Sequence, residues 1–291
     1  MISILIPTYN YNCFALVEEL NNQAKKIEID YEIIVQDDNS QLYIEENSKI
    51  NSLVNCSFKI NSENLGRTIN RQSLAQNSKF ELLLFLDSDV FPEKKTFLKD
   101  YLDFYNNENV VCFGGYKYAN IPLDASKLLR HKYGKEREEK PSKIRNKNPY
   151  SYVFSGNMLI EKSTFLNANF SDTINIYGMD IYFSYNLYIN AIPVLHIDNA
   201  IYHNGLEDNV GFFNKCLESV ESRKRYLADK KDISKINSLL RYYLWIKKLK
   251  FERIVYWLFL KFEKAMKTLI LHKNPNITCL DLYRLGYICK K

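Results

Sequence analysis

The sequence predicts an α/β fold in which helices cover both faces of a mostly parallel sheet. Short apolar runs end in turn-forming residues, helix-spaced apolar residues lie between these runs, and only helical patterns follow residue 212. Strands and helices that alternate at this spacing are typical of βαβ units. Strands of such sheets are buried on both faces, which explains their continuous apolar character. Because only helical patterns follow residue 212, the last part of the chain is expected to be a helical appendage.

The N-terminal third contains the clearest pattern. Strands are expected at residues 2–6, 31–35, 57–60 and 82–86, and helices at 14–26 and 67–76. In the first helix, Leu16, Leu20 and Ala24 recur at helical spacing, which places them on one face. Pro7 ends the first strand.

The later pattern is less regular. Residues 130–147 contain eight Lys/Arg and three Glu with little apolar periodicity, so we expect a mobile loop there. A strand interrupted by a turn is expected at 152–160, a helix at 181–188, and short strands at 194–197 and 200–202. We assign residues 1–211 to one α/β domain and 212–291 to a helical C-terminal region, which would be the part to contact a membrane or a second subunit.

Composition excludes several classes. The chain has 291 residues, 46% of them hydrophobic, and a net charge of +6, so it is too apolar to be disordered. No G-x-G-x-x-G or P-loop motif is present, and the six cysteines include no C-x-x-C pair. The N-terminus does not resemble a signal peptide, and the apolar run at 254–260 is too short to span a bilayer. We therefore expect a cytoplasmic protein, peripheral on the inner face of the membrane if its C-terminal region binds lipid.

Polar clusters follow three of the expected strands, at residues 7–10, 37–40 and 87–89. In parallel sheets, ligands bind beyond the carboxyl ends of the strands, so these clusters should meet at one site. Asp87 and Asp89 could reach one hard divalent cation, Mn²⁺ or Mg²⁺, of the kind that bridges to substrate phosphates. The alternative for this pair is an ordinary turn in which Asp87 caps a helix.

Five motifs in this order resemble the inverting family 2 glycosyltransferases of the GT-A fold. They are SILIPTYN at 3–10, IIVQDDNS at 33–40, NLGRTINRQ at 64–72, FLDSDVFP at 85–92 and YGMD at 177–180. The resemblance implies a metal-dependent enzyme that moves a sugar from a nucleotide diphosphate donor, with UDP as the expected nucleotide. The acceptor would be a hydroxyl of a glycan or of a lipid-linked saccharide in polysaccharide biosynthesis.

The resemblance also implies roles for residues that bind the nucleotide. Pro7, Thr8 and Tyr9 would lie against the nucleoside, and Asp38 would accept a hydrogen bond from the base, while Asp37 would be structural. Arg71 would bind phosphate or fix Asp38, with Arg67 as a helper. Asp87 would contact the ribose or a metal-bound water.

The remaining implied roles concern the metal, the sugar and the chemistry. Asp89 and His203 would hold the cation, and Ser155, Gly156 and Asn157 would lie near the donor sugar or the acceptor, although a plain turn explains these three equally well. Asp180 would be the general base, although an Asp at this position is also a common helix N-cap. The family often has Glu before this Asp, where this chain has Met179.

The C-terminal region carries nine Lys/Arg and two Glu between residues 241 and 273, interleaved with aromatic residues. A basic, aromatic helix could lie on an anionic membrane, and the alternative is a helix that packs on protein. Two other functions remain open. The chain could be a family member that has lost activity, or a nucleic-acid-binding module; the absence of any reader motif means that no nucleic acid is expected as a partner.

Overall fold

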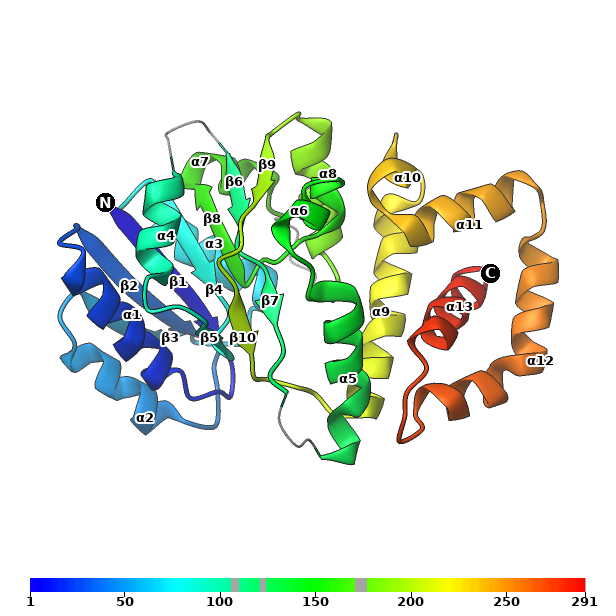
Figure 1. The fold of residues 1–291 in the computed structure, drawn as a ribbon, viewed down its shortest axis with the longest axis horizontal. Helices are drawn as coiled ribbons and strands as arrows, with labels where there is room; N and C mark the ends of the chain where they lie inside the picture. Colours follow the sequence, from blue (N-terminus) through cyan, green and yellow to red (C-terminus); the bar gives the residue numbers. More distant parts are fainter. Residues whose placement is uncertain (106–109, 121–123, 171–176, 291) are drawn as a thin grey trace. The chain divides into compact units, whose positions relative to one another are not determined.

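A computed structural model of the chain describes residues 1–105, 110–120, 124–170 and 177–290. Its main sheet has seven strands in the order β3-β2-β1-β4-β8-β6-β9, as Figure 1 shows. They are β1 Ile2–Thr8, β2 Tyr31–Asp37, β3 Cys56–Ile60, β4 Leu82–Leu86, β6 Val111–Phe113, β8 Asn157–Glu161 and β9 Val194–His196. Only β8 runs antiparallel to its neighbours, so the predicted fold class is confirmed.

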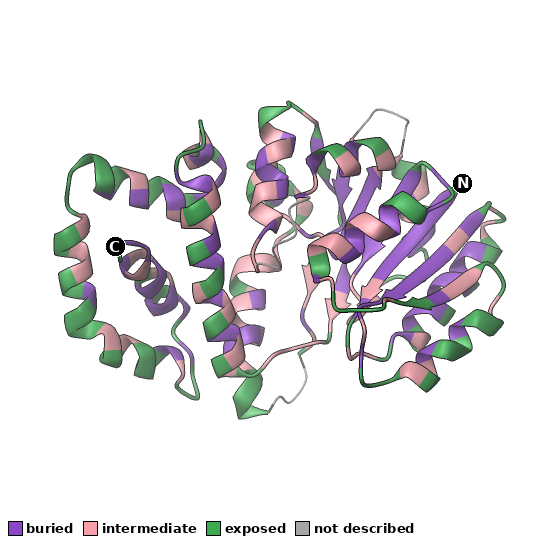
Figure 2. Cartoon of the chain, turned by 180° about the vertical axis from the view of Figure 1, so that it is seen from behind, coloured by how far each residue is buried: buried purple, intermediate pink, exposed green. Residues whose placement is uncertain are grey.

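Helices cover both faces of this sheet. Helices α1 (Phe14–Lys26) and α4 (Phe97–Phe104) pack on one face, where alternate strand residues such as Ile4 and Leu84 are completely buried. Helices α3 (Arg67–Asn77) and α7 (Lys162–Ala168) pack together on the other face, where the rings of Phe85 and Phe165 lie 4.4 Å apart. Figure 2 shows the resulting continuous burial of the central strands. The short helix α2 (Ile44–Ser48) follows β2.

A second, three-stranded sheet has the order β5-β10-β7. Its strands are β5 (Val90–Pro92), β7 (Tyr116–Lys117) and β10 (Ile201–His203). Because β5 continues the chain directly after Asp89 and pairs antiparallel with β10, His203 lies opposite Val90. This pairing therefore brings the C-terminal end of β10 close to the loop that follows β4.

The prediction of a loop at 130–147 was wrong. The segment forms α5 (Leu128–Tyr133), a π-helical turn (Gly134–Glu138) and α6 (Ser142–Arg145). Its charges are paired instead of being spread in solvent: Arg130 is buried and contacts Glu138 at 3.1 Å and Glu207 at 3.5 Å. A charged composition hid these helices because the partners of the charges lie within the fold.

The bounds of two other elements differ from those predicted. The strand expected at 152–160 begins only at Asn157, and the helix expected at 181–188 is α8 (Asp180–Ile189).

The chain divides into two compact units. Unit 1 comprises 1–119, 140–175 and 186–205, and unit 2 comprises 120–139, 176–185 and 206–291. Unit 2 thus takes two earlier segments in addition to the C-terminal region expected at 212–291.

Unit 2 is helical in its C-terminal part. It contains α9 (Asn209–Leu227), α10 (Ile233–Ile236), α11 (Ser238–Lys248), α12 (Glu252–Ile270) and α13 (Ile277–Ile288). Helix α13 is central, since it contacts α5, α9, α11 and α12 (Figure 1). Within the ranges described, no helix combines the length and apolar character that crossing a bilayer requires.

Candidate active site

Two of the three predicted polar clusters meet at the ends of neighbouring strands. Thr8 stands beside Asp37 in the β1–β2 register, and the Asp38 amide donates to the Thr8 carbonyl at 2.9 Å. The Asn10 amide donates to the Ser40 hydroxyl at 2.7 Å, and the Asn10 side chain accepts from the Gln41 amide at 2.9 Å. The loops after β1 and β2 are therefore joined by direct hydrogen bonds.

The loop after β1 presents its residues in different ways. Tyr9 is exposed, Pro7 is half-buried, and Thr8 is buried with its hydroxyl donating to the Tyr11 carbonyl at 3.3 Å. Of the three residues expected at the nucleoside, Tyr9 and Pro7 offer side-chain surface to a ligand. Tyr11 was not predicted as a site residue, yet burial and the neighbouring charge of Asp89 raise the pKa of its hydroxyl.

Asp37 and Asp38 both organise loops. Asp37 accepts hydrogen bonds from the amide and the hydroxyl of Ser40, at 2.7 and 2.6 Å, and is fully buried. Asp38 accepts from the amides of Leu65 and Gly66, both at 2.8 Å, and from the side chain of Asn61 at 3.0 Å. Asp38 therefore ties the loop before α3 to the end of β2. A carboxylate has about four acceptor positions, so these three hydrogen bonds leave about one unused on a residue that is 4% exposed.

Arg71 pairs with Asp87, and not with Asp38 as one reading of the sequence suggested. Both groups are largely shielded from water. Burial alone would raise the pKa of Asp87, but the charges of Arg71 and Arg67 and the imidazole of His203 hold this pKa below its usual value. Asp87 is thus a stable carboxylate. Its contact with Arg71 brings the guanidinium of α3 to the third polar cluster.

Asp89 and His203 lie together at the expected metal site. Nε2 of His203 is 3.7 Å from Oδ2 of Asp89, because β10 pairs with β5 and the Asn204 amide donates to the Asp89 carbonyl at 2.9 Å. Nδ1 of His203 is buried and has no hydrogen-bond partner in the described structure. The rings of Tyr116 and Tyr118 flank the imidazole at 5.7 and 5.8 Å.

These two side chains could supply two ligands to one divalent cation. Among residues whose placement is described, no group of three or more His, Cys, Asp or Glu side chains could hold a metal. A carboxylate and an imidazole are acceptable ligands of Mn²⁺, and nucleotide-bound ions commonly take their remaining ligands from phosphates and water. These two donors would leave the other ligand positions of such an ion to groups outside this pair.

Two glycines leave the space that the carboxylates of Asp87 and Asp89 occupy. A Cβ atom on Gly156 would stand 2.2 Å from Oδ2 of Asp87, and one on Gly205 would stand 1.9 Å from Oδ2 of Asp89. Both distances are far below van der Waals contact, so any larger residue would displace a carboxylate. Gly156 was predicted near the sugar, whereas Gly205 was not singled out. Asp89 is far from Gly205 in the sequence and close to it only in space, so the residues around Gly205 do not reveal this contact.

Asn157 has a structural task. Its side chain accepts from the Tyr101 hydroxyl at 2.7 Å and donates to the carbonyls of Gly115 and Asn199 at 2.8 and 3.0 Å. It is completely buried. Both polar atoms of its amide are therefore used inside the fold, and its expected place near the sugar stays a prediction. Ser155 and Gly156 remain as the parts of this motif beside Asp87.

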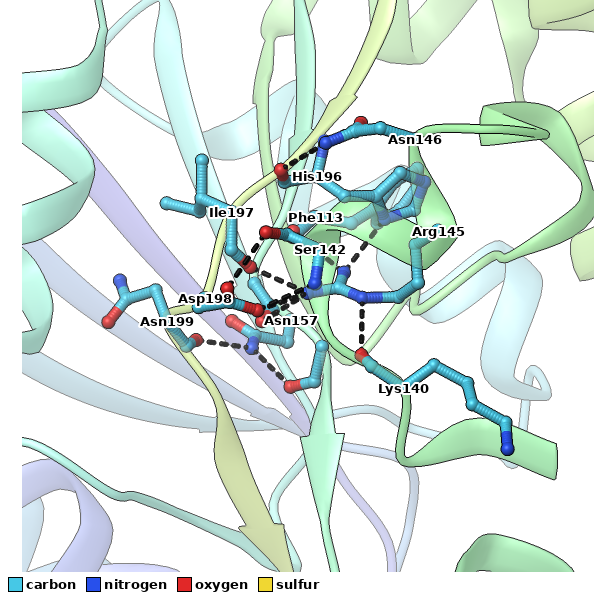
Figure 3. A network of polar contacts seen from close by, with 12 residues as sticks. Phe113, Lys140, Ser142, Arg145, Asn146, Asn157, His196, Ile197, Asp198 and Asn199 are labelled. Carbon is cyan, nitrogen blue, oxygen red and sulfur yellow. Dashed lines mark hydrogen bonds and ion pairs between the residues drawn. The ribbon is translucent and has the colours of Figure 1, made fainter. Parts of the chain in front are cut away.

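Arg145 is the main supporting residue that the sequence did not reveal. Its guanidinium is buried beneath the small sheet and donates to the carbonyls of Phe113, Gly114 and Ile197, at 3.2, 3.2 and 2.6 Å (Figure 3). Nη1 also lies 2.8 Å from Nδ1 of His196. Arg145 thereby joins the ends of β6 and β9 just before the chain enters β10. Its place in a charged run concealed it.

The YGMD motif belongs to unit 2 and packs on α9. Gly178 has a φ of +91°, and a Cβ there would stand 2.5 Å from the Ser219 hydroxyl. The Tyr177 amide donates to Glu218 at 3.2 Å. Met179 is buried, whereas Asp180 is half-exposed as the first residue of α8. Met179 thus fills a hydrophobic position, and Asp180 places a partly exposed carboxylate at the start of α8.

Comparison with known proteins agrees with this arrangement. The sequence model described as "Glycosyl transferase family 2" matches residues 3–165, which is more than half of the chain. No curated protein sequence matches the chain significantly.

Solved structures with the same fold are distant in sequence. Staphylococcus aureus TarS is 19% identical with a TM-score of 0.52, over 80% of this chain and 41% of that one. TarS 1–349 in complex with UDP-GlcNAc is 18% identical with a TM-score of 0.50, over 98% and 90% of the two chains. The mannosyltransferase PcManGT from Pyrobaculum calidifontis, in complex with GDP-Man and Mn²⁺, is 12% identical with a TM-score of 0.62, over 99% and 85%. The chain thus spans less than half of the longer TarS, and these likenesses show a shared GT-A fold.

Proposed function

The chain belongs to glycosyl transferase family 2 and is a glycosyltransferase, and we propose that it is a metal-dependent, inverting enzyme whose donor is a UDP-sugar. The observation that carries the proposal is the approach of His203 to Asp89 at 3.7 Å, beside the Arg71–Asp87 pair. A cation site and a guanidinium then meet where a donor diphosphate would lie.

Binding of the donor is assigned to unit 1. Pro7 and Tyr9 offer surface to the nucleoside, and Asp38 keeps one acceptor position for the base. Asp87, held by Arg71, would contact the ribose or a water on the cation. The likeness to proteins in complex with UDP-GlcNAc and with GDP-Man supports a nucleotide sugar in general. UDP remains our proposal because it rests on the family's pattern at Asp38.

Asp89 and His203 would hold Mn²⁺ or Mg²⁺. When bound, such a cation supplies positive charge where the departing diphosphate becomes more negative. Mn²⁺ in the PcManGT complex supports this proposal.

Asp180 is proposed as the general base. In an inverting transfer, the acceptor hydroxyl loses its proton to this carboxylate while its oxygen forms a bond to the anomeric carbon. The bond from that carbon to the β-phosphate oxygen breaks, and its electrons leave with the nucleoside diphosphate. We propose as acceptor a hydroxyl of a glycan or a lipid-linked saccharide, in polysaccharide biosynthesis.

A thermal-shift experiment tests donor and metal together. UDP, UDP-sugars and GDP-mannose are added with and without Mn²⁺ to the wild-type chain, to Asp89→Asn and to a surface control, Asp103→Asn. Ligand at a hundredfold excess over its Kd stabilises a protein by about 2.7 kcal/mol. We expect UDP to stabilise the wild type and the control only with Mn²⁺, and Asp89→Asn hardly at all. Equal stabilisation of all three proteins without metal would refute metal dependence.

The stereochemical part needs a separate measurement. Once a transfer product is found, proton NMR of its anomeric centre should show inversion relative to the donor. Retention of configuration would refute the single-displacement role given to Asp180.

A further inference from the structure

Helix α12 has two apolar faces, and only one of them is covered by protein. On its inner face, Phe259 and Ile270 are buried, and the Phe259 ring packs 4.9 Å from that of Tyr283 on α13. The outer face, defined here as Ile254, Trp257, Leu258, Phe262 and Leu269, is 43–58% exposed at each residue. With 3.6 residues per turn these five form one stripe along the helix. Figure 2 shows the contrast between exposed α12 and buried α13.

The neighbouring helix adds further exposed aromatic surface. Tyr242 and Trp245 on α11 and Leu249 at its C-cap recur at helical spacing and are 53%, 60% and 41% exposed. Trp245 and Trp257 are the only tryptophans of the chain. Indole rings favour the boundary between water and lipid, where one edge is apolar and the other is hydrated.

Charges on α12 are sorted by face. Its two acids turn toward the protein: Glu252 accepts from the Tyr243 hydroxyl at 3.3 Å, and Glu263 accepts from the Tyr283 hydroxyl at 3.0 Å. Arg253, Lys261 and Lys264 are exposed beside the outer face. The Lys261 ammonium lies 3.8 Å from the centre of the Trp257 ring. A lysine in this place can reach lipid headgroups while its methylene chain covers apolar surface.

An apolar stripe flanked by basic residues favours one of three binding partners: a second copy of the chain, a nucleic acid or a lipid surface. A second copy docked through the same face would bring bases against bases, because a two-fold contact matches a surface with itself. A nucleic acid would satisfy the bases and leave the leucine, isoleucine and phenylalanine side chains without a partner. An anionic lipid surface satisfies both the apolar stripe and the basic flank.

We propose that the outer face of α12, together with the exposed face of α11, docks the protein on an anionic lipid surface, with α12 lying in the plane of the interface. The stripe extends over most of the nineteen residues of α12, which curves strongly along its length in Figure 1. A lipid-linked acceptor would be met at the same surface.

The two tryptophans permit a direct test on the full chain. Emission spectra are recorded with vesicles of phosphatidylcholine alone and with vesicles containing one quarter phosphatidylglycerol, with or without brominated acyl chains. We expect a blue shift and bromine quenching only with the anionic vesicles, and a loss of binding as salt is raised. Vesicle flotation measures the partition coefficient.

Matched variants separate the apolar and the charged contributions. Lys261→Ala and Lys264→Ala should each lower the partition coefficient about fivefold. Leu258→Ser combined with Phe262→Ser should abolish quenching, and since both residues are exposed the fold should survive, which circular dichroism would verify. Lys49→Ala and Val54→Ser, exposed positions of unit 1, are the controls and should change nothing.

Three outcomes would overturn the proposal. Emission and flotation that do not change with anionic vesicles would do so, as would equal losses in the control variants. Sedimentation showing a dimer whose tryptophans are already shielded would assign the face to a second copy. None of these readouts requires donor or acceptor, so their failure leaves the proposed transfer reaction untouched.

Discussion

Arg145 donates a hydrogen bond to Nδ1 of His196 across 2.8 Å, in the interior of unit 1. Arginine has no acceptor atom, so this nitrogen of His196 must be unprotonated. Nε2 of His196 then carries the hydrogen and donates it to the Pro149 carbonyl at 3.0 Å. Burial, and secondarily the charge of Arg145, lower the pKa of His196 to about 4, whereas its Pro149 contact acts in the opposite direction.

This pair predicts that stability falls in mild acid. His196 has a lower pKa in the folded chain, about 4, than the 6.5 of an exposed imidazole, so only the unfolded chain takes up its proton between these values. Neutral His196 makes its full contribution to the free energy of unfolding above about pH 6.5. As the pH falls to about 4, the free energy of unfolding decreases by roughly 3 kcal/mol. Urea unfolding at several pH values would measure it. The free energy of unfolding should depend less steeply on pH in His196→Gln than in the wild type, and equally steeply in the surface variant His272→Gln. The same pH dependence in all three proteins would contradict the prediction.

Arg145 should be essential to the framework of the site. Replacing it with Met removes one hydrogen bond from each of the carbonyls of Phe113, Gly114 and Ile197 and takes a charged partner from the interior. We expect a loss of about 3–5 kcal/mol in the free energy of unfolding. Arg145→Lys should recover little, because a single ammonium cannot reproduce the planar guanidinium contacts. Lys143→Met, an exposed change in the same helix, is the control. A midpoint of urea unfolding within error of the wild type in Arg145→Met would refute this role.

Gly205 should affect the metal more than the fold. An alanine there would push its Cβ into Asp89, so Mn²⁺-dependent binding of UDP should weaken by about tenfold or more, a cost of at least about 1.4 kcal/mol. Titration calorimetry with and without Mn²⁺ would measure it. Asn204→Ala is a matched control, because its backbone contact with Asp89 is retained. Unchanged affinity in Gly205→Ala would show that Asp89 does not need its observed position.

Asp180→Asn should separate binding from chemistry. Loss of a general base costs roughly 10²–10⁴-fold in rate. We expect transfer to fall by this factor while the affinity for UDP with Mn²⁺ stays within about twofold, since no donor contact is assigned to Asp180. Comparison of kcat with donor affinity checks the prediction. Asp208→Asn, which alters the N-cap of α9, controls for a purely local structural effect. Activity that survives in Asp180→Asn would remove it from the mechanism.

Local pattern was enough for most of the main sheet. The helix expected at 14–26 has these bounds, and the strand at 82–86 also agrees, because apolar periodicity directly reflects burial of one face or of two. The charged segment at 130–147 was misread as a loop. Arg130 and Arg145 find their partners within the fold, and composition cannot reveal where a charge is paired.

The same distinction applies to the site. Asp89 and His203 were expected to share a cation, and the antiparallel contact of β5 with β10 brings them together. Asp87 was expected to bind ribose or a water, but its contact with Arg71 required the structure. Asn157 was expected near the sugar, and only the structure revealed that its amide binds Tyr101, Gly115 and Asn199.

The sequence by itself determined the α/β class, the positions of most main strands along the chain and the acidic residues at their ends, since these depend on the spacing of neighbouring residues. Only the tertiary structure decided which charged groups meet, which glycines carboxylates approach, and that α12 keeps one apolar face uncovered. Those properties depend on contacts between segments far apart in the chain. Such contacts are set by packing of the whole unit, and the local spacing of residues does not encode them.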